Sequence, residues 1–107
     1  MAATLVYITA PGRDEAARIG RAVVEARLAA CANVIPGMTS FYWWQGALQE
    51  DQEAVLILKT RPDLVDALTA KVKELHGYQV PCVVALPIEK GNPDFLDWIN
   101  EETCERP

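Results

Sequence analysis

The chain has 107 residues, of which 50% are hydrophobic and 23% are charged, and its formal net charge at pH 7 is -5. This length suits one domain with a single modest core, and the apolar content excludes intrinsic disorder. Lysine and arginine are not clustered, which argues against nucleic acid, and no apolar run approaches the roughly 18 residues that cross a bilayer. We therefore expect one domain, residues 1–107, that binds neither nucleic acid nor membrane.

The beginning of the chain predicts a buried strand. The segment MAATLVYITAPG has no positively charged start and is cut short by Pro11-Gly12, so it is not typical of a signal peptide. The sequence also has 3 cysteines, an odd number without a CxxC pair, which fits a reducing compartment better than a disulfide framework. We expect a cytoplasmic protein.

A helix is predicted after this strand, over residues 14–30. Asp14 is its expected N-cap, and apolar residues recur at three- and four-residue spacing, at Ile19, Val23, Ala26 and Ala30.

Residues 31–60 predict an unusually long β-hairpin. The first arm carries a run of aromatic residues, Phe41, Tyr42, Trp43 and Trp44, and the second ends in an aliphatic run over 55–58. Gln45-Gly46 is the expected two-residue turn, since glycine accepts a positive φ without strain. This turn places Trp43 opposite Leu48 and Tyr42 opposite Gln49.

Two features of this hairpin predict contacts between copies of the chain. An arm from residue 32 to 44 reaches roughly 40 Å, whereas the preceding helix reaches only about 25 Å, so the tip projects. Side chains alternate along a strand, so Phe41 and Trp43 lie on one face and Tyr42 and Trp44 on the other. We expect these aromatic residues to form the interface of a homo-oligomer. The alternative is a tip that folds back over its own sheet.

The remaining elements follow from proline, glycine and apolar spacing. Pro36-Gly37 predicts a bulge in the first arm of the hairpin. Pro62 and Asp63 begin a second helix that Gly77 ends in a left-handed cap. Residues 80–88 predict a strand with prolines that suit an edge or a strand end, and Asn92-Pro93 begins a short third helix.

The order of these elements predicts an α+β fold. It is the ferredoxin-like β-α-β-β-α-β sandwich, with a long hairpin between its second and third strands and a C-terminal helix. Both helices of this arrangement cover one face of the sheet. The other face needs a cover, which a neighbouring subunit supplies in an oligomer.

A series of short segments in this order and spacing also resembles one known family, the CutA divalent-cation tolerance proteins. The matching segments are Thr9-Ala10-Pro11, Leu28-Ala29-Ala30-Cys31-Ala32-Asn33, Ile35-Pro36-Gly37, Tyr42-Trp43-Trp44 with Gly46, Ile57-Leu58-Lys59-Thr60, Tyr78-Gln79-Val80-Pro81 and Leu96-Asp97-Trp98. The resemblance implies a ferredoxin-like subunit, a homotrimer held together by the long hairpins, and a role in tolerance of copper and other divalent metals. It also implies kinship with trimeric PII-type signalling proteins and no established reaction.

The resemblance to this family first suggests a metal site. Family members with a proposed copper site carry a cysteine before Thr-Ala-Pro and paired histidines before the later tyrosine segment, where this chain has Ile8 and Leu75-His76-Gly77. His76 is the best remaining ligand for copper or another divalent cation, with Cys31 or a carboxylate as its partner. The alternatives are a histidine that stabilises a helix end and a cysteine that is a small buried apolar residue.

A second candidate site combines Lys59, Tyr78, Glu89 and Trp98. In a trimer these residues would line a cleft between subunits. The chain would then be a PII-like scaffold that binds a small anion in this cleft and signals to a partner protein. The alternative is an interfacial ion pair, in which Lys59 pairs with Glu53 or Glu89.

The sequence therefore favours a non-enzymatic homotrimer of divalent metal tolerance, with the anion-binding scaffold as the second hypothesis. An enzyme is disfavoured because there is no paired nucleophile and base, no HExxH and no glycine-rich phosphate loop. RNA recognition is disfavoured because the third strand lacks the aromatic residues of such domains and the net charge is negative.

Overall fold

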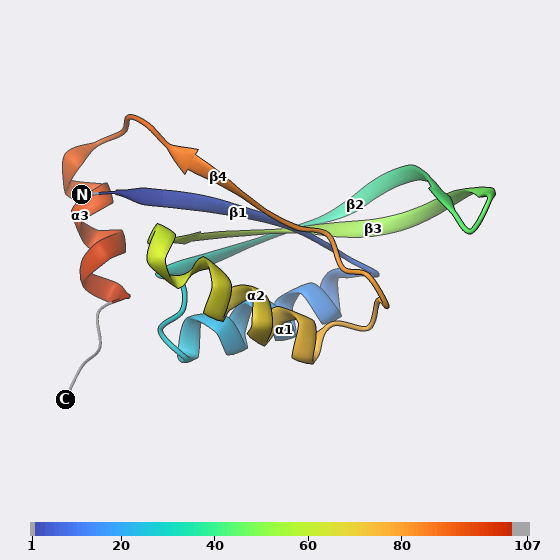
Figure 1. Ribbon diagram of the computed structural model, residues 1–107, viewed down its shortest axis with the longest axis horizontal. Coiled ribbons are helices and arrows are strands. Elements are labelled where there is room, and N and C mark those ends of the chain that lie inside the picture. Colours follow the sequence, from blue (N-terminus) through green and yellow to red (C-terminus); the bar gives the residue numbers. More distant parts are fainter. Residues whose placement is uncertain (1, 104–107) are drawn as a thin grey trace.

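The structure is a computed structural model that describes residues 2–103. Its elements, in chain order, are β1 (Ala3–Ala10), α1 (Arg13–Glu25), β2 (Cys31–Trp44), β3 (Ala47–Thr60), a 3-10 turn (Pro62–Leu64), α2 (Val65–Leu75), β4 (Val83–Ile88) and α3 (Pro93–Glu102). Figure 1 shows α1 and α2 beneath the sheet and α3 at the end that also holds the N-terminus. Within residues 2–103, no helix has the length and apolar character needed to cross a membrane.

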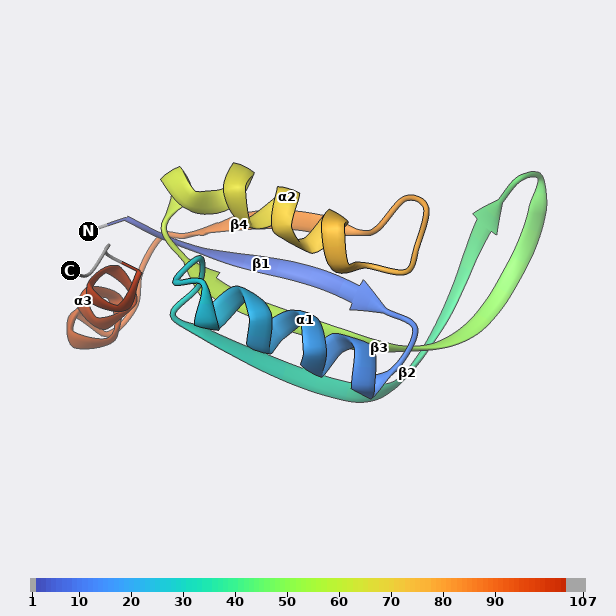
Figure 2. The same ribbon diagram turned by 90° about the horizontal axis from the view of Figure 1, so that it is seen from below.

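The four strands form one sheet in the order β2-β3-β1-β4, and each neighbouring pair is antiparallel. Figures 1 and 2 show α1 and α2 side by side on the same face of this sheet. The ferredoxin-like α+β fold expected from the sequence is therefore confirmed. β2 and β4 are the edge strands, and Pro87 lies in β4, where a missing N–H breaks no central ladder.

The core lies between the sheet and these two helices. Alternate residues of β1 and β3 point into it, and paired residues such as Val6 with Leu58 and Ile8 with Leu56 are fully buried. From α1, Ile19 supplies the facing side chain. The other face of the sheet carries apolar side chains that no helix covers, including Ile35, Val84 and Leu86. That a neighbouring subunit covers this face stays a prediction.

The hairpin has the register that the sequence predicts. Trp43 pairs with Leu48 and Tyr42 with Gln49, because Gln45 and Gly46 form a two-residue turn in which both take positive φ, 50° and 83°. The ladder also shifts register between Ile35 and Met38. This shift confirms the bulge predicted at Pro36-Gly37, where Gly37 has φ 81°.

The tip of the hairpin projects well beyond the helices (Figure 1), and Figure 2 shows that it bends away from the body of the sheet. The structure is 46 Å long and only 29 Å and 21 Å across. The two aromatic faces differ: Phe41 and Trp43 are 65% and 74% exposed, whereas Tyr42 and Trp44 are 37% and 39% exposed. The chain thus partly covers one aromatic face itself and leaves the other to solvent.

Several expected boundaries were wrong. The N-cap of α1 is Gly12 and not Asp14, which lies in the first turn, and the helix ends at Glu25, before Arg27 takes a positive φ. His76, with extended backbone, ends α2 in place of the left-handed cap predicted at Gly77. β4 begins at Val83 and not at residue 80. Hydrogen bonds to distant segments help to decide such ends, because they compete with local capping for the terminal N–H and C=O groups.

Candidate functional site

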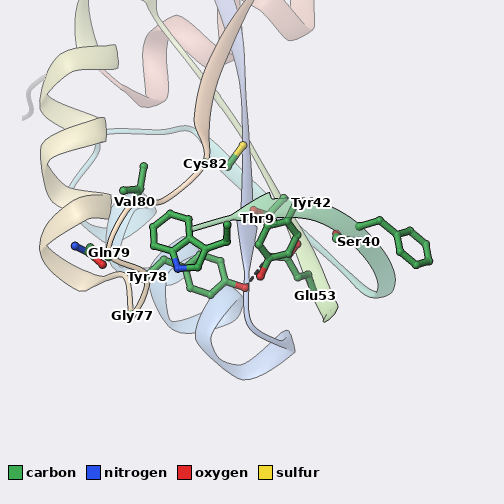
Figure 3. A pocket seen from close by; sticks show the side chains of 11 residues that line it. Thr9, Ser40, Tyr42, Glu53, Gly77, Tyr78, Gln79, Val80 and Cys82 are labelled. Atoms are coloured by element: carbon green, nitrogen blue, oxygen red, sulfur yellow. Dashed lines mark hydrogen bonds between the residues drawn. The ribbon is translucent and has the colours of Figure 1, made fainter. Parts of the chain in front are cut away.

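The main cavity lies at the base of the hairpin, next to the segment that joins α2 to β4. Its volume is about 610 Å³, within the range of small-molecule sites. The lining residues are Thr9, Ser40, Phe41, Tyr42, Trp44, Glu53, Gly77, Tyr78, Gln79, Val80 and Cys82. Figure 3 shows Tyr42, Glu53 and Tyr78 close together in this cavity, with Cys82 on the side toward β4.

Glu53 and Tyr78 form the polar centre of the cavity. Glu53 comes from β3, where the strand leaves the body of the sheet, and is only 7% exposed. The Tyr78 phenol donates a hydrogen bond to Glu53 Oε2 at 2.6 Å (Figure 3). Burial and this hydrogen bond raise the pKa of the Tyr78 phenol far above its usual value, so the phenol stays protonated and the carboxylate accepts.

A second phenol and carboxylate lie on the hairpin beside this pair. The Tyr42 hydroxyl donates a hydrogen bond to Asp51 Oδ2, which lies diagonally opposite on β3. That hydrogen bond is the main cause that raises the pKa of Tyr42. The charges of Glu53 and Asp51 both act on Tyr78, so the cavity has a negative potential at its polar end.

His76 connects three segments behind the cavity. Its Nε2 donates a hydrogen bond to the Thr9 carbonyl at 2.7 Å, because a carbonyl oxygen can only accept. Its Nδ1 accepts from the Tyr78 backbone N–H at 3.0 Å. Glu15 Oε2 accepts from the Gly77 N–H at 3.0 Å and lies 3.5 Å from Nδ1. His76 therefore fixes the position of the Tyr78 segment relative to β1 and α1.

These contacts do not support the metal site expected from His76 and Cys31. A metal needs a free nitrogen lone pair, but one ring nitrogen carries a proton and the other already accepts a hydrogen bond. Cys31 pairs with Lys59, whereas the Thr9 that His76 contacts pairs with Val55, so the two lie at opposite ends of the sheet. Among residues 2–103, no group of three or more His, Cys, Asp and Glu side chains could hold a metal ion. The third cysteine of the sequence, Cys104, lies outside the described residues.

The four residues expected in an intersubunit cleft lie in two places within one chain. Lys59 donates to Asn33 Oδ1 at 2.8 Å, and its Nζ lies 5.8 Å from the centre of the Phe95 ring, which stacks on Trp98. Glu89 directly follows β4, whose last residue, Ile88, pairs with Ala3. Tyr78 lies instead beside the hairpin base, so the fold of one chain does not bring the four residues together.

The expected pairing of Lys59 with Glu53 is not formed within the chain. Both lie on β3, six positions apart, which is about 20 Å along a strand. Glu53 takes Tyr78 as its partner instead, and none of the ion pairs within residues 2–103 contains Lys59. In the sequence, the signal for this contact is a charged residue, Glu53, directly before the apolar run 54–58.

Comparison with known proteins identifies the family. Residues 4–102 match the family model described as CutA1 divalent ion tolerance protein. The chain belongs to the CutA1 divalent ion tolerance family. This confirms the resemblance that its short segments indicate.

Relatives in the CutA1 family from distant organisms are identical to the chain at about half of the aligned residues. The divalent-cation tolerance protein CutA of Thermus thermophilus is 50% identical over 99 residues, which cover 92% of this chain and 96% of that protein. The chloroplastic protein CutA 1 of Oryza sativa is 46% identical over 101 residues, or 94% of this chain. The chain spans only 57% of the length of that rice protein.

Solved CutA1 structures share the fold over nearly their whole length. CutA1 from Oryza sativa superposes with a TM-score of 0.94 at 44% identity, covering 99% of this chain and 97% of that one. The divalent cation tolerance protein from Thermus thermophilus gives a TM-score of 0.92 at 49% identity, covering 95% and 99%. The projecting hairpin is thus part of a fold that these proteins share.

Proposed function

We propose that this chain acts in cellular tolerance of divalent metals, copper among them, as a homotrimer that catalyses no reaction. The observation that carries the proposal is the family match over residues 4–102, which includes every helix and strand except Ala3, the first residue of β1. Two relatives, from Thermus thermophilus and Archaeoglobus fulgidus, are named for tolerance of divalent cations and for no reaction. A cytoplasmic location is part of the same proposal, supported by free thiols at Cys31 and Cys82.

Two uncovered apolar surfaces support the homotrimer. The hairpin exposes Phe41, Trp43 and Leu48, and the open face of the sheet exposes Val84 and Leu86. Apolar surfaces of this kind are typical of contacts between chains. A closed ring of copies would cover both surfaces in every chain.

The proposed role in tolerance does not require a metal site made of His76 and Cys31. The ring nitrogens of His76 are both engaged, and the two residues lie at opposite ends of the sheet. We therefore expect tolerance to act through the assembled protein or a partner, and not through metal held by these two side chains.

Two measurements test this proposal separately. Deletion of the gene is expected to lower the copper(II) concentration that stops growth, and a plasmid copy restores tolerance; unchanged tolerance would refute the role. Calorimetric titration of copper(II) and zinc(II) into the metal-free protein is expected to show no stoichiometric site. Tight binding that His76→Ala abolishes and Lys73→Ala preserves would refute the absence of a His76 site.

The surroundings of Lys59 support a second candidate function, a PII-like scaffold that binds a small anion in an intersubunit cleft. The ammonium group has an amide oxygen and an aromatic ring as neighbours, and no carboxylate within residues 2–103 forms an ion pair with it. A bound anion would supply the missing charge. Thermal-shift titration with phosphate, citrate and nucleotides tests this: a shift that Lys59→Met removes and Lys73→Met keeps supports it.

A further inference from the structure

The cavity at the hairpin base holds a buried carboxylate without a cation. Glu53 is more than nine-tenths buried, yet no lysine, arginine or histidine within residues 2–103 forms an ion pair with it. Its hydrogen-bond partner is the neutral Tyr78 phenol. Buried charges in proteins are normally paired, because removal of an ion from water costs several kcal/mol that one neutral hydrogen bond offsets only in part.

The walls of the cavity suit a positively charged group. Tyr42, Trp44 and Tyr78 line it, and the faces of aromatic rings carry negative potential that attracts cations. No lysine or arginine is among the lining residues, and Asp51 adds a second negative charge through its contact with Tyr42. Aromatic faces around a carboxylate form the kind of site that binds alkylated ammonium groups.

We propose that this cavity binds an organic cation, an alkylated ammonium or a guanidinium group, with Glu53 as its counter-ion and Tyr42, Trp44 and Tyr78 as its walls. The Tyr78 hydroxyl holds Glu53 in place, and His76 holds the Tyr78 segment through the backbone N–H. The cation has two sources of the same chemistry. One is a free small molecule, and the other is a lysine or arginine side chain of a second copy of the chain.

The first experiment uses the intact protein and no variant. Tetramethylammonium chloride is titrated into uniformly ¹⁵N-labelled protein at constant ionic strength, and tert-butanol serves as a neutral probe of similar size. We expect saturable shifts of the Trp44 indole signal with millimolar affinity for the cation and no saturation with tert-butanol. The Trp98 indole, on α3 and outside the cavity, is expected to stay unchanged.

Two matched variants then assign the counter-ion. Glu53→Gln keeps the size of the side chain and an acceptor for Tyr78 but removes the charge, and we expect it to weaken tetramethylammonium binding about tenfold or more. Glu50→Gln removes an exposed carboxylate of the same strand that does not line the cavity, and we expect no change. Equal binding of both probes, or binding that Glu53→Gln leaves intact, would overturn the proposal.

A third arm identifies a cation from a second copy. If a lysine of another chain occupies the cavity, the small probe does not bind, and a carbodiimide joins that lysine to Glu53 in a cross-link that Glu53→Gln abolishes. An arginine in the same place gives no cross-link, because its guanidinium does not couple, and sedimentation detects it. Sedimentation of Glu53→Gln then shows at least tenfold weaker association, whereas Glu50→Gln sediments as the parent does. Such a result supports the proposal with the second source. The proposal would be overturned if the probe did not bind and association did not depend on Glu53.

Discussion

At the scale of single residues, side chains from segments far apart in the sequence converge at the hairpin base. His76 reaches back 67 positions to the Thr9 carbonyl, and Tyr78 reaches 25 positions to Glu53. Both come from the short segment between α2 and β4, which has no regular ladder of its own. The side-chain hydrogen bonds replace that ladder and decide where this segment lies.

The Tyr78 hydrogen bond predicts how stability depends on pH. An unfolded tyrosine ionises near its ordinary pKa of 10.0, and burial with the contact to Glu53 raises the pKa in the folded chain. The folded state therefore holds this proton more tightly, so its contribution is complete below about pH 10 and is lost as the pH rises further. In Tyr78→Phe we expect a shallower alkaline decline, by less than about 1.4 kcal/mol per pH unit, the limit for one proton.

Urea unfolding of both proteins between pH 7 and 11, at one fixed protein concentration, measures this difference. At neutral pH, Tyr78→Phe is expected to lose about 1–3 kcal/mol of stability, because the buried Glu53 side chain loses its hydrogen-bond donor. Parallel alkaline declines in the two proteins would contradict the assignment.

At the scale of elements, close contact between α1 and the sheet depends on a residue without a side chain. A Cβ at Gly20 would lie 2.9 Å from Leu56 Cδ1 and 3.1 Å from Ala32 Cβ. Leu56 is fully buried, so its side chain has no open space in which to move. The helix therefore packs against β2 and β3 more closely than an alanine would permit.

Gly20→Ala is a test of that packing. In an open helix the change adds about 1 kcal/mol of stability, because alanine is the better helix former. Here overpacking costs about 1–3 kcal/mol, so we expect a net loss of about 1 kcal/mol in the free energy of unfolding. Combining it with Leu56→Val, which removes the contacting Cδ1, should cost less than the sum of the two changes. A gain in stability for Gly20→Ala alone would refute the close contact.

The turn of the hairpin allows a second test at this scale. Gly46→Ala places a side chain at φ 83°, which is expected to cost about 1–2 kcal/mol of stability. Gln45 has φ 50°, which asparagine tolerates better, so Gln45→Asn is expected to gain a few tenths of a kcal/mol. Gly91→Ala is the matched control, because its φ is not positive and its nearest atoms are at ordinary contact, 3.5 Å. Urea unfolding measures the effect, and equal unfolding midpoints for Gly46→Ala and Gly91→Ala would contradict the turn geometry.

At the scale of the whole molecule, the helices cover one face of the sheet and the other stays open. On the hairpin, Phe41 and Trp43 stay mostly exposed, whereas Tyr42 and Trp44 are more covered and line the cavity, which Phe41 also borders. The two aromatic faces thus have different roles in the proposed assembly. One is a surface for another chain, and the other is the wall of a site.

Trp43→Ser tests the first of these roles. The side chain is 74% exposed, so its removal should leave the fold of the chain intact while association weakens by about 2 kcal/mol for each interface that loses it. Sedimentation over a range of concentrations, with far-ultraviolet circular dichroism to check the fold, measures the effect. Lys73→Ser, an exposed change on α2, is the control, and identical sedimentation of both variants would refute the interface.

Some features of this protein follow from its sequence without any knowledge of distant contacts. The order of elements, the register of Trp43 with Leu48 and the bulge at Pro36-Gly37 all depend on side-chain periodicity or on the φ that glycine and proline accept. These are local properties of a few neighbouring residues. Strand and helix ends were predicted less well, because capping at Gly12 and His76 depends on which distant groups compete for the terminal N–H and C=O groups.

The site was decided by the tertiary structure. Sequence reasoning gave His76 a cysteine or a carboxylate as partner and gave Lys59 either Glu53 or Glu89. The fold instead gives His76 the Thr9 carbonyl and gives Glu53 the Tyr78 hydroxyl. The sequence shows which polar groups need a partner. It does not show which partners the packing of the chain brings within hydrogen-bond distance. A carboxylate buried among aromatic rings is visible only once β3, the hairpin arm and the segment before β4 have been brought together, since its chemistry comes from desolvation by all three.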